Sequence, residues 1–232
     1  MHYSIEKTLP NAGFRATTKI ERLSLGVSLD NPKYSDDHLS AILKWCQANS
    51  VVCLIFIGDH LYQYTFRLLK KDDVSAARAE ADRLGTLFKS RISRFISSRR
   101  LENEFLIVRL SELAGDEKFE LTRKAFYEIV ERGGELKESI SETAKNYIER
   151  KKRKMVLAVD DERAIQLSTS YLIDELVFYQ LLCEQGWLVE AYPGSEMPVL
   201  ADILRGRLPE APEILRKRIF HQIKAREGDQ ES

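Results

Sequence analysis

A continuous run of apolar side chains, from Val51 to Ile57, constrains the fold of this 232-residue chain more than any other segment. The run ends at Gly58-Asp59-His60 and contains no polar side chain that could face water. A half-exposed strand alternates apolar and polar residues, whereas a parallel strand covered by helices on both faces is apolar throughout. The run therefore predicts an inner strand of a parallel sheet in an α/β protein.

Further strands and helices are predicted on both sides of this run. The strands are expected at residues 22–28, 105–110 and 187–192, and the helices at about 35–49, 73–98, 116–150 and 171–183. Because strands and helices alternate, we expect a doubly wound, mainly parallel sheet with helices on both faces. A chain of this length with 44% hydrophobic residues can bury the core of one domain. We expect that domain to span residues 1–232, with residues 1–18 and 226–232 mobile.

The composition limits the partners and the compartment of the protein. Thirty-six basic and thirty-six acidic residues cancel, so the net charge predicts no general affinity for nucleic acid or membranes. No run approaches the roughly 20 apolar residues of a membrane span. Three scattered cysteines, Cys46, Cys53 and Cys183, lie in apolar stretches and indicate reduced, buried thiols without metal-ligand spacing. We expect a cytoplasmic monomer that holds no metal and no cofactor.

A candidate site follows from where the strands end. Ser24, Gly26 and Ser28 share one face of the first predicted strand, and Gly26 is expected to leave open space beside the Ser28 hydroxyl. Ser28 and Tyr192 each close a strand, and ligands bind beyond the carboxyl ends of such strands. Tyr171 and Glu175 lie four apart on one helix face, where a phenol and a carboxylate could hold an ammonium group. The spacing alone equally fits an ordinary strand-end serine and an amphipathic helix.

The same residues resemble the signatures of the tRNA-dependent cyclodipeptide synthases. An aliphatic stretch that ends in Gly-aliphatic-Ser is matched by Leu25-Gly26-Val27-Ser28. A Tyr-x-x-x-Glu motif is matched by Tyr171 to Glu175, and a later tyrosine is matched by Tyr192. The sequence departs from the family pattern at Arg22, where histidine is usual, and at Ser24, where an aliphatic residue is usual. The agreement extends from about residue 20 to residue 200.

Two further positions point to different subgroups of this family. Tyr192-Pro193 resembles the proline-bearing subgroup, whereas Asn31 is typical of the other subgroup. The resemblance implies a Rossmann-like fold similar to the catalytic domain of class I aminoacyl-tRNA synthetases. It also implies an enzyme that uses two aminoacyl-tRNAs without ATP. In agreement, the chain has neither a Walker loop nor a dinucleotide-binding fingerprint.

The resemblance also implies the roles of individual residues. Ser28 would carry aminoacyl and dipeptidyl esters in a ping-pong reaction that yields a 2,5-diketopiperazine. Glu175 and Tyr171 would bind the α-ammonium group, Tyr171 would relay a proton, and Tyr192 would order the pocket. The residues expected to bind the substrate are Ser24, Gly26, Asn31, Ile55, Leu110, Phe178 and Glu190.

Glu190 and a basic helix carry two further hypotheses about substrates. A buried carboxylate at Glu190 would favour a cationic or hydrogen-bonding amino acid, unless a shifted register leaves it exposed. For tRNA, phosphate contacts are expected from a set of cations on and after the 73–98 helix: Arg83, Lys89, Arg91, Arg94, Arg99 and Arg100. A solvated amphipathic helix fits the same pattern. The run Arg150 to Lys154 is a second candidate for tRNA or a solvated connection.

Two other functions stay open at the level of the sequence. A noncatalytic RNA-binding module with a synthetase-like fold would keep the basic helix without needing Ser28, Tyr171 and Glu175 together. A serine hydrolase would need a histidine base, and His60, after the Val51 strand, is the suitable one. The sequence lacks the Gly-x-Ser-x-Gly motif of many such hydrolases.

Overall fold

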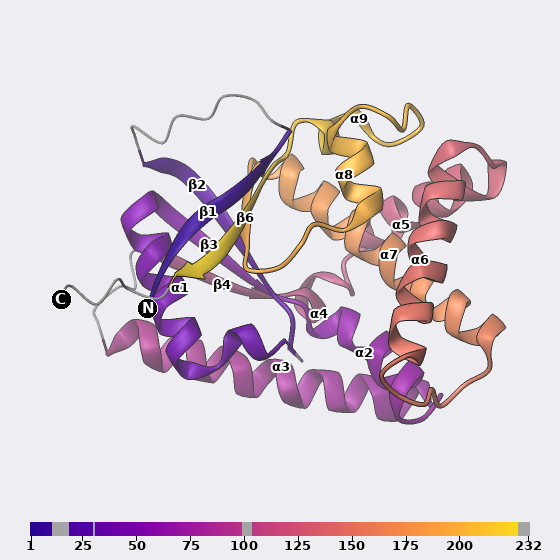
Figure 1. Ribbon diagram of the computed structural model, residues 1–232, viewed down its shortest axis with the longest axis horizontal. Helices are drawn as coiled ribbons and strands as arrows, with labels where there is room; N and C mark the ends of the chain where they lie inside the picture. Colours follow the sequence, from indigo (N-terminus) through magenta and orange to yellow (C-terminus); the bar gives the residue numbers. More distant parts are fainter. Residues whose placement is uncertain (11–18, 30, 99–103, 227–232) are drawn as a thin grey trace.

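The computed structural model describes residues 1–10, 19–29, 31–98 and 104–226 and contains a single sheet flanked by helices (Figure 1). The elements in chain order are β1 (His2–Leu9), β2 (Ile20–Val27), η1 (Pro32–Tyr34), α1 (Asp36–Asn49), β3 (Ser50–Ile57), α2 (Asp59–Leu69), α3 (Val74–Ser97), β4 (Phe105–Arg109), α4 (Leu110–Leu113), α5 (Glu117–Arg132), α6 (Glu135–Lys152), α7 (Asp161–Glu184), β5 (Val189–Tyr192), α8 (Pro198–Leu204), α9 (Glu213–Arg216) and β6 (Ile219–Arg226).

The sheet has the strand order β1-β6-β5-β2-β3-β4, and every neighbouring pair except β1 and β6 is parallel. This confirms the predicted doubly wound α/β fold. The chain runs outward from β2 through β3 to β4 and then returns to the other side of β2 with β5. The order therefore reverses between β2 and β5, and a crevice opens at such a point beyond the carboxyl ends of the strands.

The pleat of β2 and β3 divides the core between the two faces of the sheet. Leu25 and Ile55 are register partners, and both pack on the face that α1 and α3 cover. Their neighbours Gly26 and Phe56 are also partners, and the Phe56 ring lies in the other core with residues of α7. The face under α7 is therefore the one that leads to the crevice.

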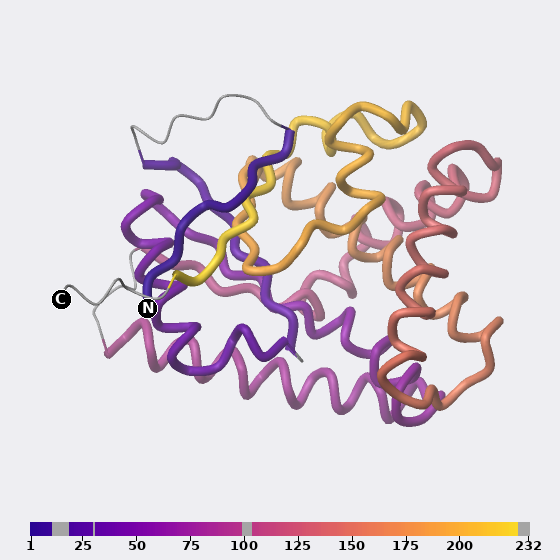
Figure 2. Tube along the Cα trace, in the orientation of Figure 1, coloured from indigo at the N-terminus to yellow at the C-terminus, as the bar shows by residue number. Residues whose placement is uncertain are grey.

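The chain termini join the sheet, contrary to the expected mobility of residues 1–18. Residues His2–Leu9 form the edge strand β1, which pairs antiparallel with β6 from the other end of the chain. Figure 2 shows the two strands side by side. Charged residues alternate weakly with apolar ones in both, although only β1 is an edge strand and β6 lies between β1 and β5. No local pattern in the sequence reveals a pairing between strands more than 200 residues apart. Residues 11–18 and 227–232, which were also expected to be mobile, lie outside the described residues.

Several helices differ from the sequence prediction, and α4, α8 and α9 have no counterpart in it. The expected helix over 116–150 is two helices, α5 and α6, because Gly133 and Gly134 adopt φ angles of 89° and 107° between them. Helix α7 begins ten residues earlier than expected, where the Asp160 side chain accepts a hydrogen bond from the Arg163 backbone N–H. Helix α2 follows β3 directly and was not predicted.

Candidate active site

A cavity of about 480 Å³ opens at the carboxyl ends of β2 and β5, where the strand order reverses. All four predicted catalytic residues line it: Ser28, Tyr171, Glu175 and Tyr192. They come from three separate parts of the chain: the residue after β2, helix α7 and strand β5. The tertiary structure therefore brings together the hydroxyl, phenol and carboxylate groups that the motifs singled out.

Ser28 is the first residue after β2, and backbone hydrogen bonds hold it there. The Gly58 N–H donates to the Val27 carbonyl at 2.8 Å, and the Asn31 N–H donates to the Ser28 carbonyl at 3.3 Å. The Ser28 side chain is partly exposed and faces the cavity. A hydroxyl on a strand end, fixed on both sides by the backbone, is positioned to meet a substrate.

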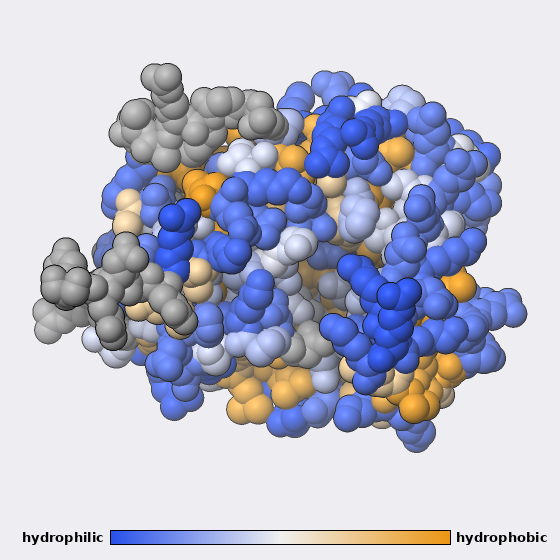
Figure 3. Space-filling view, in the orientation of Figure 1, coloured by the Kyte–Doolittle hydropathy of each residue, from blue (hydrophilic) through white to orange (hydrophobic). Residues whose placement is uncertain are grey.

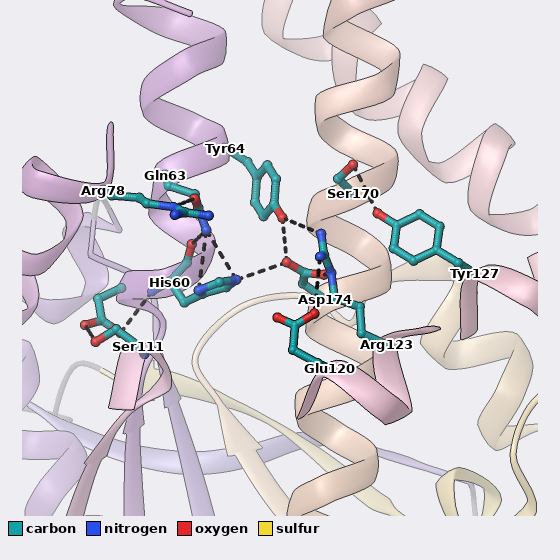
Figure 4. A network of polar contacts seen from close by, with 11 residues as sticks. His60, Gln63, Tyr64, Arg78, Ser111, Glu120, Arg123, Tyr127, Ser170 and Asp174 are labelled. Carbon is teal, nitrogen blue, oxygen red and sulfur yellow. Dashed lines mark hydrogen bonds and ion pairs between the residues drawn. The ribbon is translucent and has the colours of Figure 1, made fainter. Parts of the chain in front are cut away.

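His60 does not serve this serine, although it follows β3 as expected. Its Nε2 lies 3.0 Å from Asp174 Oδ2, and the edges of the Phe119 and Phe178 rings enclose it, with centroids 5.5 Å away. Figure 4 shows the imidazole directed toward Asp174 on α7. No histidine lines the cavity within the part of the chain that the structure describes. The arrangement therefore gives no support to a serine hydrolase.

Asp174 is the centre of a buried polar network behind the cavity. Its carboxylate is completely buried and accepts hydrogen bonds from the Tyr64 hydroxyl at 2.5 Å and from Arg123 Nε at 2.7 Å (Figure 4). The donors come from α2 and α5, so the network ties three helices together. Asp174 lies between Tyr171 and Glu175 in the sequence. We infer that the network fixes the rotation of α7 that presents these two residues to the cavity.

Glu175 has an unusual protonation equilibrium. Burial and the nearby Glu190 carboxylate raise the pKa of Glu175 to about 8, and the Tyr179 hydroxyl, which donates to Glu175 Oε1 at 3.2 Å, opposes the rise only in part. A carboxyl group with a pKa near neutrality can exchange a proton with an amine. Tyr171, Glu175 and Tyr179 repeat every four residues along α7, and all three line the cavity.

Glu190 is buried, as predicted, but it has a partner that the sequence did not indicate. The residue is 1% exposed and lines the cavity, so the register that would have left it in solvent is wrong. Arg218, which is completely buried, donates to Glu190 Oε2 from Nη2 at 2.9 Å. Arg218 lies in a charged stretch of sequence, where nothing distinguishes a buried arginine from a surface one.

Four of the seven predicted substrate-binding residues line the cavity: Gly26, Asn31, Leu110 and Glu190. Asn31 also donates from Nδ2 to the Tyr192 hydroxyl at 3.4 Å. Contrary to expectation, Gly26 leaves no open space. A Cβ atom there would lie 2.8 Å from Phe56 Cζ and 2.9 Å from Glu190 Oε1. The glycine instead lets these two side chains approach the β2 backbone.

The other three predicted substrate-binding residues do not line the cavity. Ile55 points to the opposite face of the sheet, and its neighbour Phe56 takes its place. Phe178 stacks on Phe119 with centroids 4.7 Å apart, in the core between α7 and α5. Ser24 is buried, and its Oγ donates to the Val189 carbonyl at 3.0 Å. The error for Ile55 arises because a shift of one residue along a strand reverses the face.

The cations predicted on α3 are mostly paired with acidic side chains. Arg83 pairs with Glu80, Lys89 with Glu112 and Arg91 with Asp36. Arg94 is exposed, and Arg99 and Arg100 lie outside the described residues. None of the four described cations lines the cavity.

Two cations of the other basic run lie at the cavity instead. Arg150 and Lys151, at the end of α6, belong to its lining, and Lys151 Nζ lies 5.4 Å from the centroid of the Tyr147 ring. On the face seen in Figure 3, strongly hydrophilic side chains gather beside a hollow between the sheet and α6. The sequence revealed this basic run but could not place it at the site, because α6 contacts α7 and α8 only through the tertiary fold.

The structure also bears on the cysteines, on metal-ligating groups and on the length and apolar character of the helices. Cys46, Cys53 and Cys183 are free and buried, which confirms the reading of their apolar surroundings. Among the described residues, no group of histidine, cysteine and acidic side chains could hold a metal ion. No helix in the described ranges combines the length and the apolar character that crossing a membrane requires.

The comparisons with known proteins agree with this geometry. The family model "Cyclodipeptide synthase" matches residues 12–181, and no curated protein sequence matches the chain. A cyclodipeptide synthase structure from Fluoribacter dumoffii has a TM-score of 0.78 and 20% identity, with 96% of this chain and 97% of that chain covered.

Two further structures extend the comparison. A Mycobacterium tuberculosis protein, described as showing that cyclodipeptide synthetases are related to type I tRNA synthetases, has a TM-score of 0.70 and 14% identity over 89% of this chain and 86% of that one. The cyclodipeptide synthase of Candidatus Glomeribacter gigasporarum bound to Phe-tRNAPhe has a TM-score of 0.54 and 17% identity over 95% and 93%. Because the family model spans most of its residues and the fold agrees, this chain belongs to the cyclodipeptide synthase family, a family of aminoacyl-transferring enzymes.

Proposed function

We propose that the protein joins the aminoacyl groups of two aminoacyl-tRNAs into a cyclic dipeptide through esters on Ser28. The observation that carries the proposal is the convergence of Ser28, Tyr171, Glu175 and Tyr192 on one cavity at the switch point of the sheet. A noncatalytic RNA-binding module would not need these four side chains together. The family membership of the chain and the tRNA-bound relative support the same reading.

The first step is an ester exchange. The Ser28 oxygen attacks the carbonyl carbon of the aminoacyl ester, the bond to the ribose oxygen breaks, and the serine proton ends on that ribose oxygen. The substrate ester is already activated, so the step needs no histidine base and no ATP. Tyr171, which lines the cavity one helical turn from Glu175 on α7, relays the proton in this proposal, and Tyr192 orders the pocket with its hydroxyl near Asn31.

The second and third steps use amines as nucleophiles. Glu175 holds the α-ammonium of the residue on Ser28 and accepts its proton, a transfer that suits the pKa of about 8. The freed amine attacks the ester of the second aminoacyl-tRNA, which releases that tRNA and leaves a dipeptide on Ser28. The terminal amine of the dipeptide then attacks the serine ester, which closes the ring and regenerates the hydroxyl. This last attack is intramolecular, and holding both ends of the dipeptide in one cavity brings the amine close to the ester carbon.

The tRNA is recognised through its phosphates. Arg150 and Lys151 lie at the cavity, where the acceptor end must enter for the ester to reach Ser28. The α3 cations Arg83, Lys89, Arg91 and Arg94 form a second contact surface for the body of the tRNA, and the predicted contacts of Arg99 and Arg100 lie outside the described residues. Three of the α3 cations must exchange an acidic partner for a phosphate, which weakens their contribution relative to that of Arg150 and Lys151.

Membership of the proline-bearing subgroup stays a prediction based on Tyr192-Pro193. The Pro193 carbonyl accepts a hydrogen bond from Lys33 Nζ at 2.5 Å, next to the contact between Asn31 and Tyr192. Residues typical of the two subgroups are therefore neighbours at this end of the cavity.

Ser28→Ala tests the proposed function directly. Mass spectrometry of extracts from expressing cells should detect a cyclic dipeptide for the wild type and none for Ser28→Ala. Ser24→Ala is the matched control, because Ser24 lies on the same strand but outside the cavity, and it should keep the product. In the purified protein, intact-mass measurement should find one aminoacyl group on the wild type only. Product formation by Ser28→Ala would refute the mechanism.

A further inference from the structure

The floor of the cavity is a buried ion pair, and its two carboxylate oxygens differ in their surroundings. Glu190 Oε2 accepts hydrogen bonds from Arg218 Nη2 at 2.9 Å and from Nε at 3.3 Å. Glu190 Oε1 lies under Gly26, at 2.9 Å from where a Cβ would be. The two oxygens therefore differ: one is fixed by arginine, and the other faces Gly26, which lines the cavity together with Glu190.

Glu190 Oε1 keeps capacity to accept a hydrogen bond. Among the described residues its contact is the Tyr179 hydroxyl at 3.5 Å, and the same hydroxyl lies closer to Glu175 Oε1, at 3.2 Å. At 3.5 Å the Tyr179 hydroxyl is at the limit of hydrogen-bonding distance from Glu190 Oε1 and is a weak donor to it. A buried carboxylate oxygen without a good donor is costly, so the site favours a ligand that supplies one.

Arg218 cannot leave this position to make room for another cation. It is completely buried, its Nη1 donates to the Trp187 carbonyl at 3.3 Å, and its guanidinium carbon lies 4.3 Å from the centroid of the Tyr179 ring. The charge of Glu190 is therefore already neutralised. A cationic substrate side chain would add an uncompensated buried charge, and an anionic one would meet the Glu190 carboxylate.

We propose that the ion pair of Glu190 and Arg218 selects, as the first amino acid, a neutral side chain that ends in an O–H or N–H donor. This inference rests on the proposed function and names the substrate class of the same site. Phe56 and Leu110 line the same cavity, so the body of the selected side chain is apolar and only its tip is polar. The proposal therefore excludes a cationic first amino acid, which the sequence had left open beside a hydrogen-bonding one.

Acylation of the purified wild-type protein tests the inference. The protein is mixed separately with tRNAs charged with tyrosine or phenylalanine, threonine or valine, and lysine or leucine, and the mass of the intact protein reports the group on Ser28. Tyrosine differs from phenylalanine by one hydroxyl, and threonine has a hydroxyl where valine has a methyl group. In at least one of these two pairs, we expect the hydroxyl-bearing amino acid to acylate the protein at least about tenfold faster than its partner. Lysine and leucine should react slowly.

A charge-balanced variant tests whether the ion pair of Glu190 and Arg218 causes the preference for a donor-bearing amino acid. Glu190→Leu combined with Arg218→Met removes both charges and should reduce or reverse the preference within the same pairs. The matched control is Glu213→Leu combined with Lys217→Met, which removes an exposed ion pair close in sequence and should leave the preference unchanged.

The outcomes separate the inference from the proposed function. Equal acylation within both pairs, or a preference for lysine or leucine, would overturn the inference while an acyl-enzyme still forms. Absence of acylation with these six charged tRNAs and with tRNAs charged with each of the remaining amino acids would instead overturn the proposed function. If the Glu190 and Arg218 variant does not fold, the wild-type preference still decides the question.

Discussion

The electrostatic coupling between Glu175 and Glu190 controls the protonation of Glu175 in the cavity. Both carboxylates are held in a largely desolvated cavity, and Arg218 compensates one of them directly. The result is a carboxyl group, Glu175, that is largely neutral at pH 7 and becomes ionised near pH 8. The ammonium of a bound aminoacyl group would stabilise its ionised form.

This coupling predicts the pH dependence of acyl transfer. If ionised Glu175 holds the amine, the rate of the wild type should rise with pH through about 8. In Glu190→Gln the neighbouring negative charge is gone, so the pKa of Glu175 falls and the rising limb should move to lower pH. Single-turnover rates between pH 6 and pH 8.5 measure this shift. Glu213→Gln, an exposed change, should keep the wild-type limb, and an unmoved limb in Glu190→Gln would contradict the coupling.

Gly26 gives a second prediction at this scale. In Gly26→Ala the new methyl group would meet Phe56 and Glu190 at 2.8 and 2.9 Å, so both side chains must move away from β2. We expect the fold to stay intact and the acylation rate to fall to about one tenth of the wild-type rate or below. Gly115→Ala is the matched control, because no atom lies within 4 Å of its added Cβ. Wild-type rates in Gly26→Ala would show that the floor tolerates the displacement.

At the scale of elements, α7 is the part on which the site depends. It carries Tyr171 and Glu175 toward the cavity and Asp174 toward the network of α2 and α5. An error in its rotation would move every cavity-facing residue of the helix at once. Burial of Asp174 with three hydrogen-bonding partners makes a rotated helix costly.

Asp174→Asn measures that cost. The change removes the buried anionic partner of Arg123, which keeps only the longer contact with Glu120 at 3.9 Å, and should lower the free energy of unfolding by about 3 kcal/mol. The matched control is Glu184→Gln, which removes the exposed pair with Lys118 between the same two helices and should cost less than about 1 kcal/mol. Denaturant unfolding of both variants checks the comparison. Equal stability of the two variants would mean that the network does not hold α7.

At the scale of the whole molecule, the cavity and the basic surfaces must act together on a large RNA. Arg150 and Lys151 reach the cavity from α6, whereas the predicted α3 cations lie on another helix and do not line it. The proposed tRNA therefore contacts two separate regions, one at the ester and one along its body.

Charge removal on each region distinguishes their roles. The variant Arg150→Ala with Lys151→Ala should weaken aminoacyl-tRNA binding and reduce the slope of log affinity against log salt by about 0.7 for each lost phosphate contact. The α3 variant Arg83→Ala with Arg94→Ala should weaken binding less. Binding titrations at several salt concentrations measure both. A larger loss for the α3 variant would reverse the assignment.

The sequence by itself determined the class of fold and the chemical groups of the site, because both depend on local patterns. The Val51–Ile57 run predicted the inner strand, and the motifs at Ser28, Tyr171, Glu175 and Tyr192 named the residues that line the cavity. The tertiary structure alone decided which face Ile55 occupies, that Arg218 neutralises Glu190, and that the end of α6 reaches the cavity. These facts depend on register and on contacts between distant segments, which no local periodicity encodes.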